Sequence, residues 1–128
     1  MDYDLLMNAF AEKCGLPPPE TAAGAVVIDF DGIAVSFIDN ASDRTIVLHA
    51  GIGEALGGSA GAVSREMLEA NAALGERPGA ALCQDPETKA FAAVRSIPLQ
   101  VAEPEALLEA VGDLVKTATS WRERLGQS

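Results

Sequence analysis

The stretch from residue 25 to residue 50, AVVIDFDGIAVSFIDNASDRTIVLHA, places the strongest constraint on the fold of this chain. It holds three short apolar runs of mainly β-branched and aromatic residues, a composition that suits pleated, half-buried strands. Asp31-Gly32 separates the first two runs, and this dipeptide is favoured in two-residue hairpin turns because both central residues need positive φ. A second polar break at 39–43, DNASD, is rich in residues that favour turns. The stretch is therefore predicted to form a three-stranded antiparallel meander.

Side-chain alternation gives the first two strands unequal faces. The residues of the apolar face are Val26, Ile28 and Phe30 in the first strand and Ile33, Val35 and Phe37 in the second. The opposite face is mixed and includes the carboxylates of Asp29 and Asp31. This contrast is typical of an antiparallel sheet that helices cover on one side.

Amphipathic patterns predict three helices around the meander. Residues 2–14 place apolar side chains at helical spacing, and Gly15 followed by three prolines ends the pattern. Residues 62–74 carry a thin stripe rich in small side chains. Residues 105–125 carry an unbroken apolar stripe over about five turns, which suits a helix that lies on a sheet.

Two further strands are predicted at 80–84 and 90–97, joined by a polar turn that contains Pro86. The predicted order is α-β-β-β-α-β-β-α, an α+β arrangement with a twisted antiparallel sheet packed by helices. With 128 residues, the chain is expected to form one domain over residues 1–128.

The charge balance limits the classes of partner. The formal net charge is −10 and the pI is near 4.3, which argues against nucleic acid and anionic membrane because both attract cationic surfaces. No run of about 20 apolar residues is present, and the acidic opening differs from the basic start of a secretory signal. The protein is therefore expected to be cytoplasmic. Cys14 and Cys83 fit no disulfide framework or metal spacing, so both are expected to be buried as small apolar residues.

The glycine-rich segment 51–61, GIGEALGGSAG, does not match a phosphate-binding loop. Leu56 occupies the place of the third glycine of the dinucleotide fingerprint, and the segment has no lysine for a Walker loop. We interpret the segment as a loop, with Ser59 as a candidate N-cap of the helix that follows.

No pattern indicates catalysis or metal binding. His49 is the single histidine, and neither Ser36 nor Ser59 lies in a nucleophile-elbow sequence. The aspartates near the predicted turns lack EF-hand spacing, and turn chemistry already explains them. No catalytic residue, cofactor or metal ligand is therefore predicted, and an enzyme is the least favoured function.

Five stretches taken together point to a known family. They are the opening helix that ends at Cys14-Gly15, the strand pair VIDFDGIAVSFID, the segment Met67-Leu68-Glu69-Ala70-Asn71, the strand pair that holds Leu82, Asp85-Pro86 and Phe91, and Ile97-Pro98-Leu99 before a helix ending in Trp121-Arg122. In order and spacing the chain resembles the class I type III secretion chaperones of the Tir-chaperone (CesT-like) family. The resemblance spans nearly the whole chain and rests on the five stretches together.

The resemblance implies a homodimer that binds the N-terminal, non-globular segment of a secreted effector without ATP and keeps it competent for secretion. The bound segment would lie extended in apolar grooves and add a strand to a sheet edge. By the same resemblance, the effector-binding surface would include Leu5, Leu6, Phe10, Val35 and Phe37, although periodicity does not separate Leu5 from Leu6. The dimer interface would include Val63, Met67, Leu68, Asn71, Ala81 and Leu82. For each of these residues, an ordinary place in the core is an equal alternative.

Two other classes of function stay open at this point. The first is a small α/β adaptor or scaffold that binds a folded protein partner, and the second is a small enzyme. A neighbouring gene for a secreted effector would favour the chaperone over the adaptor. Activity on small-molecule panels, lost in a His49→Ala variant, would favour the enzyme.

Overall fold

The computed structural model describes residues 2–20, 24–54, 60–75 and 79–126. Its elements in chain order are α1 (Tyr3–Lys13), β1 (Ala25–Phe30), β2 (Ile33–Asn40), β3 (Thr45–Gly53), α2 (Ala60–Leu74), β4 (Ala81–Gln84), β5 (Phe91–Pro98), the short 3-10 helix η1 (Leu99–Val101) and α3 (Pro104–Leu125). The predicted α+β class and element order are confirmed, with η1 as the one addition among the described residues.

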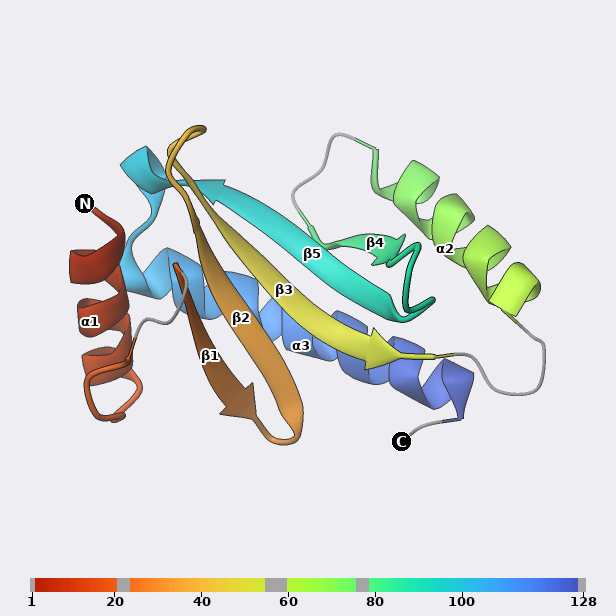
Figure 1. Cartoon of the computed structure of the whole chain (residues 1–128), viewed down its shortest axis with the longest axis horizontal. Helices are drawn as coiled ribbons and strands as arrows, with labels where there is room; N and C mark the ends of the chain where they lie inside the picture. Colours follow the sequence, from red (N-terminus) through yellow and green to blue (C-terminus); the bar gives the residue numbers. More distant parts are fainter. Residues whose placement is uncertain (1, 21–23, 55–59, 76–78, 127–128) are drawn as a thin grey trace.

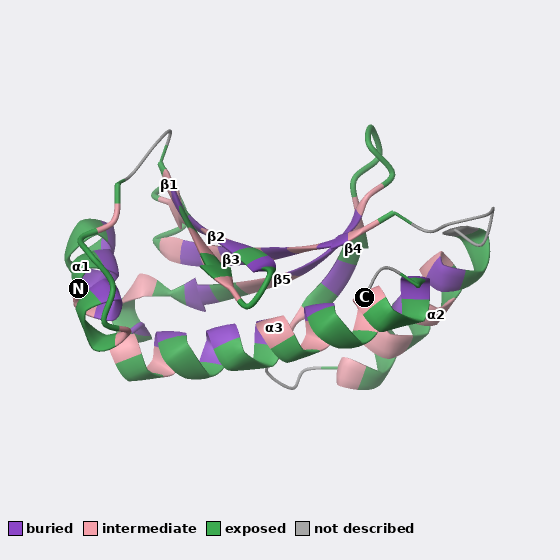
Figure 2. Ribbon diagram, turned by 90° about the horizontal axis from the view of Figure 1, so that it is seen from below, coloured by how far each residue is buried: buried purple, intermediate pink, exposed green. Residues whose placement is uncertain are grey.

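The five strands form one antiparallel sheet in the order β1-β2-β3-β5-β4. The long helix α3 runs along one face of this sheet, while α1 and α2 lie at its opposite ends (Figures 1 and 2). No helix of the described residues covers the second face. The sheet therefore has a packed face and an open face.

The turn between β1 and β2 forms as its sequence predicts. Asp31 and Gly32 both have positive φ, at 53° and 90°, and Phe30 pairs with Ile33 on either side of them. The Gly32 N–H also donates to Asp29 Oδ1 at 2.8 Å. The register of the meander therefore follows from this two-residue turn.

The packed face of the sheet and the inner stripe of α3 make up most of the core, which includes the buried side chains of Val35, Phe37, Leu48, Leu107 and Leu114. The first helix joins this core from the end of the sheet. Its Phe10 ring lies 5.3 Å from the Phe37 ring, and the Tyr3 hydroxyl donates to the Phe37 carbonyl. A ring contact and a buried hydrogen bond thus fix α1 against β2.

Two expectations from the sequence are wrong in detail. The segment 51–61 is not a loop from its start, because β3 continues through Gly53 with an irregularity in its pairing to β5 between Gly51 and Gly53. The candidate N-cap Ser59 lies outside the described residues. Cys83 is exposed because alternation along β4 points it to the open face of the sheet, opposite to the buried Leu82. Cys14, at the C-terminal end of α1, is half-buried and packs against the edge of the core.

Candidate functional site

The two outer strands of the sheet differ in what lies beside them. At the β4 edge, Asn71 of α2 donates through Nδ2 to the Leu82 carbonyl at 2.8 Å, and the Leu82 N–H donates to Asn71 Oδ1 at 2.8 Å. The side-chain amide thus satisfies the two outward backbone groups of Leu82, as a neighbouring strand would. This edge is closed by a helix, which is one way in which proteins prevent further strand pairing.

Within the described part of the chain, no side chain pairs in this way with the outward backbone groups of the β1 edge. In an antiparallel pair, successive residues point their N–H and C=O groups alternately toward and away from the partner strand. The bond from the Asp39 N–H to the Gly24 carbonyl shows which residues of β1 face β2. The backbone N–H and C=O groups of Val26 and Ile28 point toward β2, and those of Val27 and Asp29 point away from it. Val27 and Asp29 therefore offer a short row of donors and acceptors to an added strand.

A groove follows this open edge. It has a volume of about 400 Å³ and lies between β1 and the proline-rich connector that leaves α1. Its lining residues are Ala11, Leu16, Pro17, Pro18, Pro19, Glu20 and the β1 residues Val26 to Asp29. Leu16 is exposed, and Val27 is 63% exposed, which is high for a valine in a strand. The groove is mainly apolar and borders unpaired backbone, two properties that an extended peptide requires.

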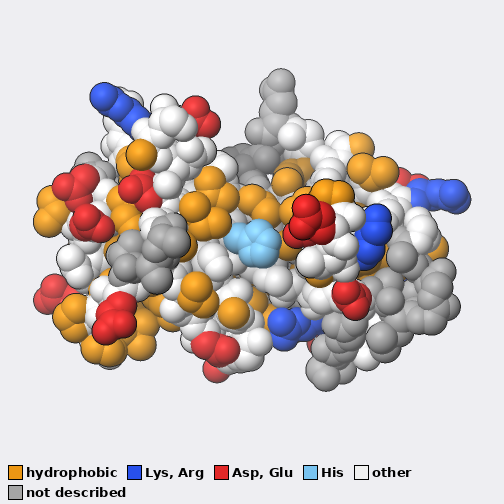
Figure 3. Space-filling model, in the orientation of Figure 1, with side chains coloured by type: hydrophobic (Ala, Val, Ile, Leu, Met, Phe, Trp, Pro, Cys, Tyr) orange, Lys and Arg blue, Asp and Glu red, His pale blue; other side chains and the backbone are white. Residues whose placement is uncertain are grey.

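The open face of the sheet continues from this groove and carries few charges. Alternation and register place Val27, Ala34, Ile38, Val47, Val94 and Ala81 on this face. Among the described strand residues that point this way, Asp29 is the one acid and no lysine or arginine occurs. Figure 3 shows the face with the single histidine near its middle and apolar side chains on both sides. A solvent-facing sheet normally carries polar side chains, so this composition indicates an interaction surface.

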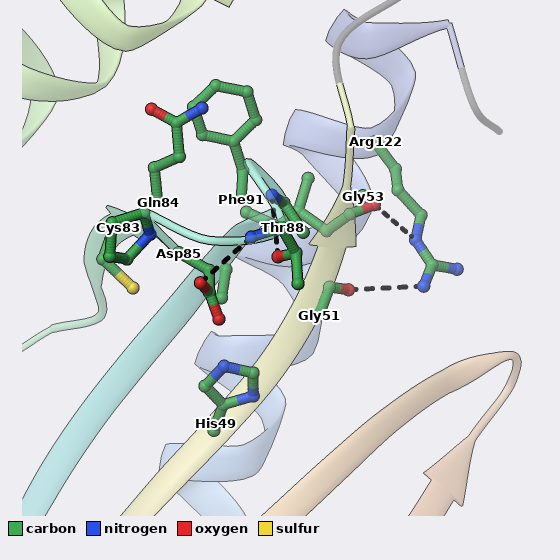
Figure 4. Close-up of a pocket in the computed structure, with 13 residues that line it drawn as sticks. His49, Gly51, Gly53, Cys83, Gln84, Asp85, Thr88, Phe91 and Arg122 are labelled. Carbon is green, nitrogen blue, oxygen red and sulfur yellow. Dashed lines mark hydrogen bonds between the residues drawn. The ribbon is translucent and has the colours of Figure 1, made fainter.

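A hollow of about 760 Å³ lies on the open face, between the end of β3 and the β4–β5 turn (Figure 4). His49, Cys83 and Asp85 contribute to its wall. Although Cys83 is exposed as a residue, partial desolvation of its thiol, and in second place the charge of Asp85, raises the pKa of that thiol, so the reactive thiolate is disfavoured. Asp85 Oδ1 instead accepts from the N–H groups of Glu87 and Thr88, at 2.8 and 3.2 Å, and stabilises the turn.

Arg122 lines the same hollow but has a structural role. Its guanidinium donates to the carbonyls of Gly32, Gly51 and Ile52 at 3.0, 3.3 and 3.2 Å. These groups belong to the β1–β2 turn and to the last part of β3, just beyond the point where β2 and β3 stop pairing. Arg122 therefore joins two backbone segments through one planar group.

The structure places the five predicted effector-binding residues very differently. Leu5 is 61% exposed, whereas Leu6, Phe10, Val35 and Phe37 are fully buried in the core. The apolar face that alternation identifies is the face that α1 and α3 cover, so the residues one step along the strand point outward instead. Sequence reasoning thus did not single out Val27 and Ile38, which the same alternation places on the mixed, outward face.

The predicted interface residues cluster around α2 and β4. Leu68 is 68% exposed and Ala81 is exposed, so both are accessible on the surface of the protomer. Val63, Met67 and Leu82 are buried, and a small apolar hollow of about 190 Å³ lies between α2 and β4. Asn71 is half-buried and engaged with Leu82. The six residues therefore form one contiguous region, part of it exposed.

Comparison with known families decides the identity of the chain. The family model described as "Tir chaperone protein (CesT) family" matches residues 5–122. The chain belongs to the Tir chaperone protein (CesT) family. No curated protein matches it by sequence.

Several solved structures share the fold of this CesT-family protein. A chain of the HopA1-SchA chaperone–effector complex superposes with a TM-score of 0.83 at 17% identity, covering 94% of this chain and 93% of the other. A chain of the ExsC-ExsE complex gives a TM-score of 0.81 at 20% identity, covering 98% and 97%. A chain of the complex between the Yersinia pestis type III secretion chaperone SycH and a fragment of YscM2 gives 0.77 at 19% identity, covering 93% and 98%. The secretion-chaperone-like fold expected from the sequence is confirmed.

Further properties of the described residues bear on other classes of function. No helix among them is long and apolar enough to span a bilayer. The same part of the chain contains no group of three or more histidine, cysteine, aspartate or glutamate side chains that could hold a metal ion.

Proposed function

We propose that this CesT-family chaperone binds the N-terminal, non-globular segment of a type III secreted effector and keeps it competent for secretion. It acts in the cytoplasm, as one domain, without ATP and without catalysis. The observation that carries the proposal is the continuity of the open β1 edge, its apolar groove and the weakly charged open face of the sheet.

The physics of this surface fits an unfolded guest better than a folded one. An added strand gains backbone hydrogen bonds at Val27 and Asp29, and these bonds do not depend on the sequence of the guest. Alternate side chains of the guest would lie against Leu16 on one side and Val27 on the other, which supplies selectivity. A segment that is disordered when free can follow such a curved and extended surface, at the cost of its conformational entropy.

The similar structures support the proposal. The HopA1-SchA assembly is a chaperone–effector complex, and the SycH structure contains a chaperone with a stable fragment of YscM2. Two Pseudomonas aeruginosa assemblies of the same fold, ExoT-SpcS and ExoU-SpcU, give TM-scores of 0.73 and 0.74. This fold is therefore found repeatedly in complexes with a second protein.

A homodimer through α2 and β4 is part of the proposal. Leu68 and Ala81 are exposed apolar residues at the closed end of the sheet, away from the β1 edge. Pairing through this region would leave both β1 edges free, so one continuous guest could contact two protomers. Contacts at two linked sites raise the effective affinity for a single chain.

The test is co-purification with the effector of the native host, for which the products of neighbouring genes are the first candidates. We expect a complex of two chaperones and one effector by size exclusion with light scattering. The double variant Val27→Asp/Ile38→Asp places charge on the open face and should abolish co-purification while the far-ultraviolet spectrum stays unchanged.

The matched control is Leu108→Asp, because Leu108 is an exposed leucine of α3, on the other side of the sheet. This variant should still retain the effector. If the open-face double variant bound the effector as well as the control, the proposed binding surface would be wrong.

A further inference from the structure

The charges along the β1 groove have one sign. Glu20 and Asp29 are the charged residues among those that line it. Within the described residues, neither carboxylate forms an ion pair with a lysine or arginine. Arg122 reaches the turn end of the β1–β2 hairpin, where Asp29 lies, but its guanidinium donates to backbone carbonyls. A guest in this groove therefore meets two carboxylates without cationic partners.

The geometry of the edge defines where a guest side chain meets these charges. A strand paired with β1 points alternate side chains to the packed side and to the open side of the sheet. On the packed side they meet Ala11, Leu16 and Ile28, all apolar. On the open side they lie next to Val27 and then Asp29, since directly opposed residues have Cβ atoms about 5 Å apart. Apolar positions and the charged position therefore fall at a fixed spacing along the guest.

We propose that the guest strand carries a lysine or arginine at the position beside Asp29, with apolar residues at the alternating positions that face Leu16. This inference rests on the proposed function and specifies the chemistry of the guest. Two carboxylates attract a cation and repel an acidic residue, and the protein's net charge of −10 adds a long-range attraction for basic segments. The backbone of β1 supplies affinity, Asp29 sets the register of the basic residue, and Glu20 adds negative charge to the same groove.

A selection from a phage-displayed library of random peptides, each about 12 residues long, tests this directly, because a strand rarely exceeds about 10 residues. The unaltered 128-residue chain is compared with the double variant Asp29→Asn/Glu20→Gln. The Asp29→Asn change keeps a side-chain oxygen that can accept the bond from the Gly32 N–H, so the turn is preserved while the charge is lost. The control is Glu87→Gln/Glu109→Gln, which removes two exposed carboxylates that do not line the groove.

We expect the wild-type chain and the control to enrich alternating apolar peptides with a basic residue at one fixed position. The double variant should enrich the apolar alternation without that basic position. A synthetic peptide of the enriched sequence should bind the double variant about three- to tenfold more weakly than the wild type, and added salt should reduce that difference.

Three outcomes would overturn the inference: enrichment of the apolar pattern with no basic position, a basic position that persists in the double variant, or no enriched pattern at all. The first two leave the proposed function intact, because co-purification of the full effector is read separately. Failure of both the selection and the co-purification would instead reject the proposed function.

Discussion

The side-chain amide of Asn71 pairs with the backbone of Leu82 in the way that a residue of a sixth strand would. Both hydrogen bonds are 2.8 Å long and together they satisfy the outward N–H and C=O of Leu82. The sheet consequently has one edge closed by a helix and one edge open at β1. This asymmetry directs any added strand to β1 and leaves α2 and β4 for a different contact.

Replacement of Asn71 by alanine should therefore weaken the fold and open the second edge. Loss of two partly buried hydrogen bonds, with two backbone groups left unpaired, should lower the free energy of unfolding by about 1–3 kcal/mol in urea denaturation. Asn8→Ala is the matched control, because Asn8 is an exposed helical asparagine of α1 and should change stability by less than about 0.5 kcal/mol. Equal effects of the two substitutions would show that the Asn71 pairing contributes nothing beyond helix propensity.

Arg122→Lys should detach the β1–β2 turn from the end of β3. A lysine keeps the charge but cannot reach three carbonyls with one planar group, and we expect a loss of about 1–2 kcal/mol in the free energy of unfolding. Hydrogen exchange at the start of β2 should become faster in this variant. Arg65→Lys, at an exposed position of α2, should alter neither quantity. Unchanged exchange at β2 in Arg122→Lys would contradict this role.

Adjacent turns of α1 should respond oppositely to a new charge. Phe10→Asp buries a carboxylate against the Phe37 ring and removes a large core side chain, a loss of at least about 3 kcal/mol that should prevent folding as judged by circular dichroism. Leu5→Asp changes an exposed side chain and should leave the chain folded, and it should weaken effector co-purification if Leu5 belongs to the effector-binding surface that the family resemblance implies. A folded Phe10→Asp variant would show that α1 can present Phe10 to a partner.

Tyr3 offers a spectroscopic report on the contact between α1 and the sheet. Burial in the first place, and then the charge of Asp39, raises the pKa of its hydroxyl to about 12, above the ordinary value of 10.0. Because the folded state holds the proton more tightly, this stabilising contribution is complete below about pH 10 and is lost as the pH rises through about 12. Tyr3 is the only tyrosine, so tyrosinate absorbance should appear near pH 12 in the native protein and near pH 10 in urea. If tyrosinate absorbance appeared near pH 10 both in the native protein and in urea, the Tyr3 hydroxyl would not be buried.

Leu68→Asp tests the proposed dimer contact more cleanly than a change at Met67. Met67 is buried within the protomer, so a charged residue there would also damage folding, whereas Leu68 is exposed. If α2 forms the two-fold contact, the variant should be a folded monomer by light scattering. Leu108→Asp, with an equally charged replacement of an exposed leucine on α3, should stay dimeric. An unchanged dimer in Leu68→Asp would move the interface away from this helix.

Local patterns were sufficient to predict the elements themselves. Asp31-Gly32 predicted a two-residue turn because positive φ is a local requirement, and the turn forms with Phe30 opposite Ile33. The apolar stripe at 105–125 likewise predicted α3, because helical periodicity can be recognised from the spacing of apolar residues within one segment. Such features depend on a few neighbouring residues and require no knowledge of the rest of the chain.

The exposure of individual residues depended on contacts between distant segments. Leu5 and Leu6 satisfy the same helical pattern, and only the placement of α1 against β2 buries Leu6 and leaves Leu5 in solvent. Val35 and Phe37 were assigned to a binding surface, but α1 and α3 cover that side of the sheet. The apolar character of a residue did not show whether its side chain is buried in the core of the protomer or exposed to a partner.

The sequence by itself determined the meander, the three helices and their order, because turn chemistry and hydrophobic periodicity are local. Only the tertiary structure decided that β1 is the open edge, since the strand order places β1 and β4 at the two edges and Asn71 of α2 occupies the outward backbone groups of β4 at Leu82. The side on which α3 packs selects one face of the sheet for the core and leaves the other to solvent. Long-range packing thus converts a predictable set of strands into a surface with a defined binding edge.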